Sequence, residues 1–263
     1  MCLIVFAWKA SAAFPLVVAA NRDEWRERPA EPARWWSDHP GLLAGRDLQA
    51  GGTWMGITRA GRFAAVTNFR DPSDKRSTAR SRGALVTEFL LGLDSPAAFL
   101  ANLSARSREY NGFNLILGDR ASLFYYGSRE GEAREIEPGV HGLSNHVLDE
   151  PWPKVVRGKA RMEAALAARD PAPALFEMLS DAAGVPDAEL PATGVGLDWE
   201  RRLASALITG ADYGTRASTV LTIAVTGEVS LEERTREAEG GVAGVASLRF
   251  TLLQRGALLH APG

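Results

Sequence analysis

The chain has 263 residues, enough for one large or two small domains with a substantial core. Its apolar fraction of 46% and charged fraction of 24% are those of an ordinary globular protein. General nucleic-acid binders and membrane-surface binders carry a strong basic excess, which a net charge of -2 does not provide. A chain with a single cysteine forms no intrachain disulfide.

Short segments rich in Val, Ile and Phe predict strands at the start of the chain, over 2–8 and 16–20. Residues 25–41 are rich in Pro, Arg and Trp and predict a long loop. Two further strand-like segments, 53–58 and 62–68, predict a hairpin.

Helical spacing of apolar residues alternates with strand patterns in the rest of the chain. The expected helices are 82–93, 96–108, 153–168 and 171–182, the second capped by Ser95. The expected strands are 113–119, 123–127, 135–137, 140–143, 218–226, 229–236 and 247–253, with 184–200 as a loop. Such separate groups of strands and helices predict an α+β fold of two mostly antiparallel sheets between helix layers, in one domain over 1–263.

The apolar stretch 2–20 needs a separate interpretation because its length approaches that of a signal peptide. It lacks a positively charged start, and Lys9 and Pro15 interrupt it, so we expect neither a leader nor a spanning helix. The prediction is a soluble, cytoplasmic protein with no integral membrane contact and no nucleic-acid partner. Its oligomeric state stays open.

Cys2 is the most unusual residue of the sequence. Cysteine is small enough for Met1 to be removed, which would leave a thiol and a free α-amino group on one residue. That amine has an ordinary pKa of about 7.7–8.0, so it can act as base for its own side chain. A buried, inert thiol is the alternative interpretation.

The tetrad Asn21-Arg22-Asp23-Glu24 follows the second predicted strand. If that strand pairs beside Cys2, it brings an arginine and an acid to the nucleophile. The arginine would lower the pKa of the thiol, and the carboxylate would hold the α-amino group. A solvated turn is the alternative.

Several other polar residues lie where strands begin or end. Asn68 ends a strand, Asn145 follows Gly142-Leu143-Ser144, and amide side chains of this kind serve in oxyanion holes. Asn114 lies within a strand, where asparagine is rare, and therefore requires a partner. Arg216 precedes an apolar strand and is close enough to reach the same pocket; turn asparagines and a surface arginine are the alternatives.

No metal site or cofactor is expected, because the four histidines, His39, His141, His146 and His260, lack metal-ligand spacing. No phosphate loop, dinucleotide fingerprint or nucleophile elbow occurs either. Arg76, Arg80 and Arg82 form a basic cluster that we interpret as a solvated loop. The tryptophans of 25–54 pack in the core or form an apolar pocket wall.

Taken together, these segments resemble the NRDE family, also called the transport and Golgi organisation protein 2 family. The matching segments, in family order, are Met1-Cys2, Asn21-Arg22-Asp23-Glu24, Gly51-Gly52-Thr53-Trp54, Thr67-Asn68, Ser81-Arg82-Gly83, Gly112-Phe113-Asn114-Leu115, Gly142-Leu143-Ser144-Asn145 and Tyr213-Gly214-Thr215-Arg216. The resemblance spans residues 1 to about 236, and residues 237–263 carry no matching motif.

The family in turn resembles choloylglycine hydrolases and penicillin V acylases, which are N-terminal-nucleophile (Ntn) hydrolases. The resemblance implies their sandwich fold and cleavage of a linear amide in a small acylated substrate. It implies these catalytic residues: Cys2 as nucleophile and, through its own amine, general base, Arg22 and Asp23 as its supporting pair, Asn68 as oxyanion donor, Asn145 as a second polar clamp, and Arg216 as a distal arginine. We expect the substrate to contact Asn21, Glu24, Trp54 and Asn114.

One departure and two alternatives remain. The acylases separate their arginine and acid by two residues, whereas Arg22 and Asp23 are adjacent and would point to opposite faces of a regular strand. Members of the family have been connected with Golgi organisation and secretion, with lipid or acyl-CoA metabolism, and with haem mobilisation. The alternatives to a hydrolase are therefore a non-catalytic carrier of haem or an acyl lipid, and a scaffold for trafficking partners.

Overall fold

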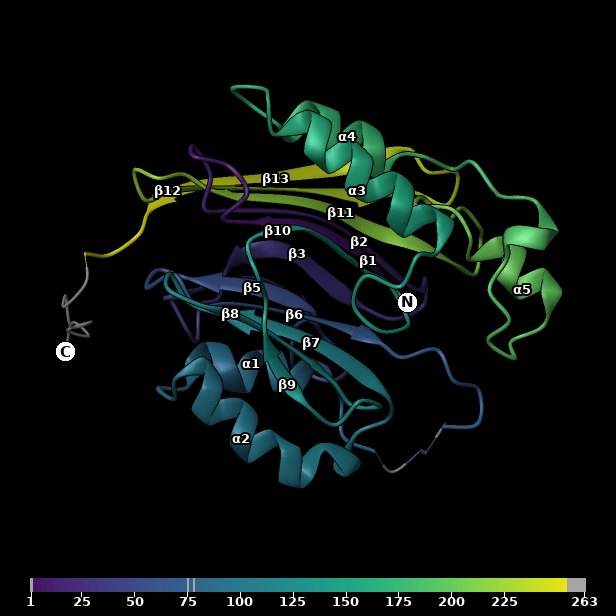
Figure 1. Ribbon diagram of the computed structural model, residues 1–263, viewed down its shortest axis with the longest axis horizontal. Helices are drawn as coiled ribbons and strands as arrows, with labels where there is room; N and C mark the ends of the chain where they lie inside the picture. The colour runs from purple at the N-terminus through teal and green to yellow at the C-terminus, as the bar shows by residue number, and fades with distance from the viewer. Residues whose placement is uncertain (1, 75, 78, 255–263) are drawn as a thin grey trace.

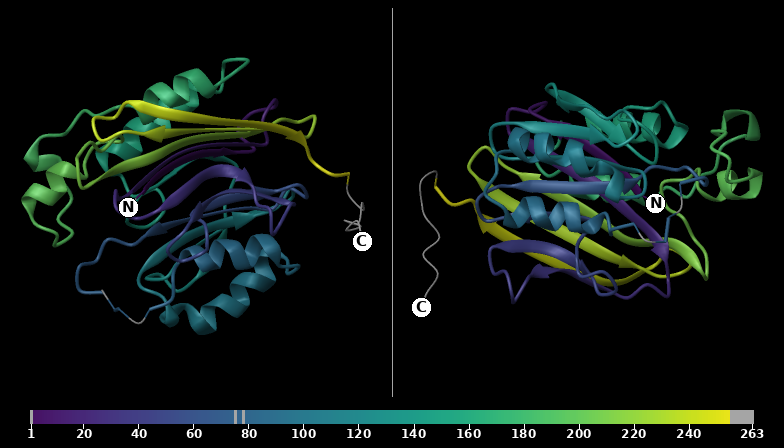
Figure 2. Two further views of the ribbon diagram at one scale, coloured as in Figure 1. Left: turned by 180° about the vertical axis from the view of Figure 1, so that it is seen from behind. Right: turned by 90° about the horizontal axis from the view of Figure 1, so that it is seen from below.

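The computed structural model describes residues 2–74, 76–77 and 79–254. Within these residues, two antiparallel sheets stack face to face between two layers of helices (Figure 1). The view from behind shows the same succession of layers (Figure 2, left). The α+β sandwich expected from the sequence is confirmed.

The first sheet carries the start of the chain at its centre and has the strand order β10-β1-β2-β11-β12-β13. Its strands are β1 (Cys2–Trp8), β2 (Leu16–Trp25), β10 (Gly139–Leu143), β11 (Tyr213–Ile223), β12 (Glu228–Arg236) and β13 (Val242–Thr251). Both β1 and β2 therefore have hydrogen-bonded neighbours on each side.

The second sheet keeps its strands in chain order. They are β3 (Ala30–Trp35), β4 (Leu42–Asp47), β5 (Met55–Thr58), β6 (Phe63–Asn68), β7 (Phe113–Gly118), β8 (Leu123–Gly127) and β9 (Ala133–Glu135). Successive strands are joined by short turns except between β6 and β7, where the chain leaves the sheet to form two helices.

Each sheet has its own helix layer (Figure 1). The helices are α1 (Gly83–Leu91), α2 (Pro96–Arg106), α3 (Pro153–Ala165), α4 (Ala172–Leu179) and α5 (Leu197–Arg202), with short 3-10 turns η1 (Ser107–Glu109) and η2 (Asp187–Glu189). Helices α1 and α2 cover the second sheet, and α3 and α4 cover the first. Ser95 caps α2 as predicted, since its side chain accepts a hydrogen bond from the Ala98 N–H. Within the described residues, no helix is long and apolar enough to span a bilayer.

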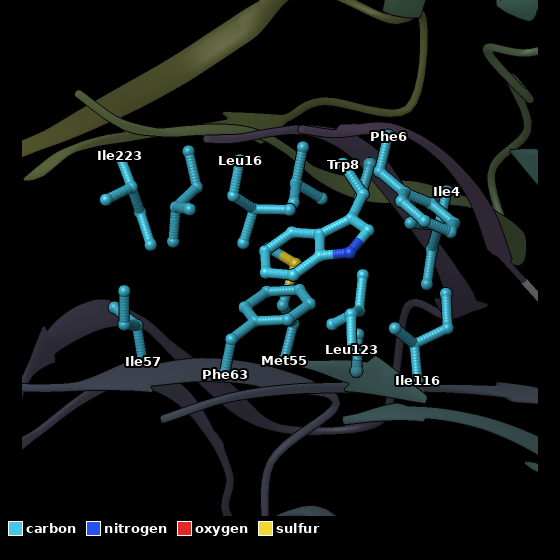
Figure 3. Close-up of a cluster of buried hydrophobic side chains, with 14 of the residues drawn as sticks. Ile4, Phe6, Trp8, Leu16, Met55, Ile57, Phe63, Ile116, Leu123 and Ile223 are labelled. Atoms are coloured by element: carbon cyan, nitrogen blue, oxygen red, sulfur yellow. The ribbon is translucent and has the colours of Figure 1, made fainter. Parts of the chain in front are cut away.

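The main core lies between the two sheets. Figure 3 shows Ile4, Phe6 and Trp8 of β1 facing Met55 and Phe63 of the second sheet. Because strand residues alternate between faces, the even-numbered residues of β1 and β2 enter this core, and the odd-numbered ones pack under α3 and α4. Each large apolar side chain buried there stabilises the fold by about 1.5–3 kcal/mol.

Two segments of polar residues are ordered strands. The tetrad at 21–24 lies inside β2, not in the alternative solvated turn, because pairing with β11 extends the strand to Trp25 beyond its last β1 pair at Arg22. The predicted loop 25–41 contains β3, which pairs with the unpredicted β4. Its Pro and Arg residues are tolerated because β3 forms the edge of its sheet. The predicted loop 184–200 contains η2 and the start of α5.

Candidate active site

Cys2 begins β1 directly opposite Arg22 of β2. The alternation of the two strands places both side chains on the face toward the second sheet, in line with Ile4 and Ala20 of the core. Cys2 is half-buried and Arg22 is buried. The expected pairing of the strand that carries the tetrad beside Cys2 is therefore present.

A cleft of about 400 Å³ opens at this end of the sandwich. Strands β1, β2 and β6, the 47–54 loop and the start of α1 form its walls. Six of the ten predicted site residues line it, namely Cys2, Arg22, Asp23, Glu24, Trp54 and Asn68. Arg22 stacks on Trp54, with its guanidinium carbon 4.4 Å from the ring centre.

Asp23 is buried on the helix side of β2. Its carboxylate accepts a hydrogen bond from the Thr215 hydroxyl at 2.7 Å, and burial raises the pKa of the group. The positive charge of Lys154, on α3, acts in the opposite direction. Lys154 is itself buried, which lowers its pKa to about 8, and its ammonium donates to the Leu203 carbonyl. Arg22 and Asp23 thus point to opposite faces, as their adjacency requires.

The pKa of the Cys2 thiol is raised, because burial disfavours the thiolate. The charge of Arg22 lowers this pKa as expected, but burial outweighs it. The expected effect of Arg22 is present, and burial, which the sequence does not show, sets the net direction. A base has to remove the proton when the thiol reacts.

Asn68 is the last residue of β6 and lines the cleft. Among the described residues, its side-chain amide has no hydrogen-bond partner, so the N–H groups remain available to a ligand. Its backbone carbonyl accepts a hydrogen bond of 3.0 Å from the Asn145 side chain. Asn145 is fully buried and does not line the cleft.

Asn114 holds the loop that carries Asn145. Its amide donates to the His146 carbonyl at 2.7 Å and to the Thr67 hydroxyl, and its oxygen accepts from Tyr125. The Ser144 hydroxyl in turn donates to the Cys2 carbonyl at 3.1 Å. The hydrogen-bond partner expected for a strand asparagine is present. Asn114 does not line the cleft, so the predicted contact with a substrate there is not supported.

Asn21 and Arg216 also lie away from the cleft. Asn21 faces the helix layer, where its amide donates to the carbonyls of Leu179 and Ala206. Arg216 occupies a β-bulge of β11 and donates to carbonyls of the 25–28 turn. Neither side chain is among the residues that line the cleft, and both are engaged with backbone oxygens.

Sequence reasoning missed the arginines of the cleft. The cluster Arg76, Arg80 and Arg82 was interpreted as a solvated loop, but all three residues line the cleft, as does Arg28. Arg76 and Arg80 have side chains that are about half exposed outside any helix, as that interpretation expects, whereas Arg82 is half-buried where α1 begins. The Ser81-Arg82-Gly83 motif was the available signal, since Arg82 is half-buried there and donates to the Gly112 carbonyl.

A second cavity of about 410 Å³ adjoins the cleft. The two share four lining residues: Glu24, Asn68, Arg82 and Asn111. Its wall is aromatic, because Trp25, Trp199 and Tyr213 meet edge-on there with ring centres 5.3–6.1 Å apart. A ligand that filled both cavities would place a polar part near Cys2 and an apolar part against these rings.

His141, Asp149 and Lys159 fasten the loop that follows β10. The Asp149 carboxylate accepts from His141 Nδ1 and Lys159 Nζ at 2.7 Å each, and from the Gly142 N–H at 2.9 Å. Although burial opposes it, these hydrogen bonds lower the pKa of Asp149 to about 2, and the bond to Asp149 raises the pKa of His141. This loop carries Ser144 and Asn145, so the cluster supports the site indirectly.

The stabilising effect of this cluster depends on pH. Asp149 stabilises the fold above its unfolded pKa of about 3.9 and loses this effect as pH falls through about 2. His141 stabilises it below its unfolded pKa of about 6.5 and loses this effect as pH rises through its raised folded pKa. Asp149→Asn is expected to lower the unfolding free energy by about 1–2 kcal/mol near pH 5 and by less once the pH exceeds the raised pKa of His141, after allowance for solvent screening.

Urea unfolding at several pH values measures this difference. Asparagine tolerates the left-handed backbone of Asp149 (φ 62°), so the substitution tests the charge rather than the turn. Glu150→Gln, which removes the partner of the exposed His146, is the matched control. Equal destabilisation by Asp149→Asn at all pH values would contradict the assignment.

Among the described residues, no group of three or more His, Cys, Asp or Glu side chains is arranged to hold a metal ion.

Sequence comparison finds close relatives over most of the chain. The family model described as Transport and Golgi organisation 2 matches residues 1–238. The Transport and Golgi organization protein 2 homolog of Bos taurus is 37% identical, with 89% of this chain and 92% of that protein covered. The Homo sapiens homolog is 34% identical over the same shares.

Structural comparison finds the same sandwich at much lower identity. A mutant conjugated bile acid hydrolase from Clostridium perfringens superposes with a TM-score of 0.51 and 9% identity, covering 94% of this chain and 92% of that chain. At this identity the likeness shows the Ntn-hydrolase-like fold.

Proposed function

The chain belongs to the Transport and Golgi organisation 2 family, and from this premise and the geometry of the cleft we propose that it is an N-terminal cysteine hydrolase that cleaves a linear amide. The observation that carries the proposal is the placement of the single cysteine at the start of a core strand, opposite Arg22 and in a cleft that also contains Asn68. The bile acid hydrolase of similar fold was solved as a cysteine-to-alanine variant at its second position, which supports the same assignment for Cys2.

The reaction begins after Met1 has been removed. The neutral α-amine of Cys2 takes the thiol proton, and the sulfur attacks the carbonyl carbon of the amide. A C–S bond forms, and the carbonyl electron pair moves to the oxygen. When this intermediate collapses, the C–N bond breaks and the departing amine takes the proton from the α-ammonium group. Water, deprotonated by the same amine, then attacks the thioester, and the C–S bond breaks to release the acid.

Four side chains support these steps. The Asn68 amide, which is available in the cleft, donates to the developing oxyanion. Asn145 holds the backbone of Asn68 in position through its hydrogen bond of 3.0 Å and acts as a positioning residue. Arg22 stabilises the thiolate whose formation burial disfavours. In this scheme the buried carboxylate of Asp23, fixed by Thr215, orients the freed α-amino group.

Intact-mass measurement tests this proposal. Protein with Met1 removed is expected to form a covalent acyl adduct at Cys2 when mixed with activated amides or esters, whereas protein that retains Met1 forms none or forms it at least about 100-fold more slowly, because the amine base is missing. Mixing the two forms in one tube gives an internal control for reagent quality. Equal acylation of both forms would contradict the amine-as-base mechanism, and no adduct with any activated acyl compound would refute the hydrolase.

A second candidate function is a non-catalytic carrier of haem or an acyl lipid. The aromatic wall formed by Trp25, Trp199 and Tyr213 favours it, since such a wall suits a flat or apolar ligand. A carrier requires no chemistry at Cys2, and its ligand affinity would be insensitive to that side chain. The dependence of function on Cys2 separates the two candidates.

A further inference from the structure

The N-terminus of α1 reaches the cleft because two glycines let the backbones approach. A Cβ atom on Gly52 would lie 2.7 Å from the carbonyl carbon and oxygen of Gly83, and one on Gly83 would lie 3.0 Å from the Thr53 oxygen. Only residues without side chains allow this contact. The start of α1 is therefore seated beside Trp54, and Gly83 itself lines the cleft.

This end of α1 is favourable for an anion. The first N–H groups of a helix carry the positive end of its dipole. In α1 the N–H groups of Ala84 and Leu85 already donate to the carbonyls of Ser81 and Arg82 at 3.1 Å, so the helix acts on an anion mainly through this dipole. The N-cap residue of α1 is Arg82, no side chain caps the helix, and its first turn contains no acidic residue. Sequences usually fill such positions with Ser, Thr, Asp or Asn.

Two guanidinium groups at the same place lack a close carboxylate. Arg82 donates to the Gly112 carbonyl and, among the described residues, has no carboxylate within 4.0 Å. Arg22 is 94% buried, since its exposed fraction is 6%, and its nearest carboxylate, that of Glu24, is 4.0 Å away. Among the described residues, Arg22 has no hydrogen-bond acceptor, although it lines the cleft.

Two other arginines of the cleft, Arg28 and Arg80, have carboxylates close enough to balance their charge. Arg28 pairs with Asp47 at 2.6 Å, and Arg80 pairs with Glu88 at 2.7 Å and Glu109 at 3.0 Å. Burial lowers the pKa of Arg82, which means that its charge costs free energy where it stands. Arginine stays charged in proteins, so an anion from outside would offset this cost.

We infer that Arg22, Arg82 and the N-terminus of α1 form an anion subsite beside Cys2, which binds a carboxylate or phosphate group of the ligand. The inference rests on the proposed function in one respect only, namely that the ligand is the substrate acylating Cys2. It narrows the substrate class to anionic acyl compounds whose apolar part fits the aromatic cavity. Arg82, which lines both cavities, is the residue that selects the charge.

A matched pair of alkylating agents tests the subsite without acyl transfer. Iodoacetate and iodoacetamide both alkylate a thiolate with loss of iodide, but only iodoacetate is an anion. Because the chain has a single cysteine, intact mass reports alkylation of Cys2 alone. We expect the rate ratio of iodoacetate to iodoacetamide to exceed that of a small free thiol, and to fall about tenfold in Arg82→Gln, the usual effect of losing one charge-assisted hydrogen bond.

Two further variants make the result specific. Arg82→Lys keeps the charge and is expected to retain part of the preference, which a folding defect would not allow. Arg249→Gln removes a positive charge from the exposed strand β13 and is expected to leave the ratio unchanged. The inference is overturned if Arg82→Gln keeps the wild-type ratio, or if Arg249→Gln lowers it equally.

Competing ions identify the chemistry of the anion. Protection of Cys2 from iodoacetamide by inorganic phosphate indicates a phosphate-bearing ligand, protection by acetate indicates a carboxylate, and protection by neither counts against the subsite. The two proposals fail separately. A charge preference without acyl adducts refutes the hydrolase and keeps the subsite, whereas acyl adducts without a charge preference refute the subsite and keep the hydrolase.

Discussion

Replacing Cys2 with alanine is expected to lower the turnover of an amide substrate by at least about 10⁴-fold, because it removes the single thiol of the chain, which forms the covalent intermediate in the proposed reaction. The fold should persist. The pairing of Cys2 with Arg22 is made by backbone groups, and the side chain is only half-buried at the end of β1. Turnover of an anionic N-acyl substrate, followed by release of the amine, is the measurement.

The control for this prediction is Cys2→Ser, which keeps a nucleophilic side chain and the strand geometry. It is expected to form an acyl adduct slowly, whereas Cys2→Ala forms none. If the alanine variant turns over the substrate as fast as the wild type, Cys2 is not the nucleophile. Unchanged affinity of Cys2→Ala for haem or an acyl ligand, together with absence of turnover in the wild type, would favour the carrier instead.

Replacing Glu200 with alanine is expected to lower the unfolding free energy by about 3–5 kcal/mol, the usual cost of leaving a buried charge without its partner. Glu200 of α5 pairs with Arg70 at 2.6 Å, and both side chains are almost fully buried. Its second oxygen accepts from the N–H and hydroxyl of Thr193. Two of the Arg70 nitrogens already lack a hydrogen-bond partner, so the remaining ion pair is the main compensation for its charge.

Equilibrium urea unfolding measures this loss, and an exposed ion pair is the matched control. Arg201, on the same helix, pairs with Asp187 at 2.6 Å, but both side chains are about half exposed. Asp187→Ala is expected to cost about 1 kcal/mol or less. The double variant Arg70→Met/Glu200→Leu is expected to be more stable than Glu200→Ala, since it leaves neither charge of this ion pair buried without its partner. Similar losses for Glu200→Ala and Asp187→Ala would contradict this assignment.

The strands with clear apolar patterns were predictable because local composition determines them. The segment 2–8 matches β1, and 123–127 matches β8. The ends of β2 and the whole of β3 were not predictable in this way. Their polar residues are held extended by pairing with β11 and β4, segments far away in sequence or without a strong pattern of their own.

The candidate site, like the fold, was predictable from the sequence only in part. The reactive character of Cys2, the opposite directions of Arg22 and Asp23, and the need of Asn114 for a partner all follow from residue chemistry and strand alternation. The sequence could not show that Asn21 and Arg216 would be engaged by backbone carbonyls away from the cleft. Nor could it show that burial would raise the pKa of the thiol despite Arg22.

By itself, the sequence determined the family, the layered fold and the one possible thiol nucleophile, because these depend on residue types and their spacing. Only the tertiary structure decided which polar side chains face the cleft. That depends on which face of a sheet the helices cover, and on which residues before α1, such as Arg80 and Arg82, line the cleft at the end of the sandwich. Arg82 therefore belonged to an apparent surface loop in the sequence and to an anion-binding position in the fold.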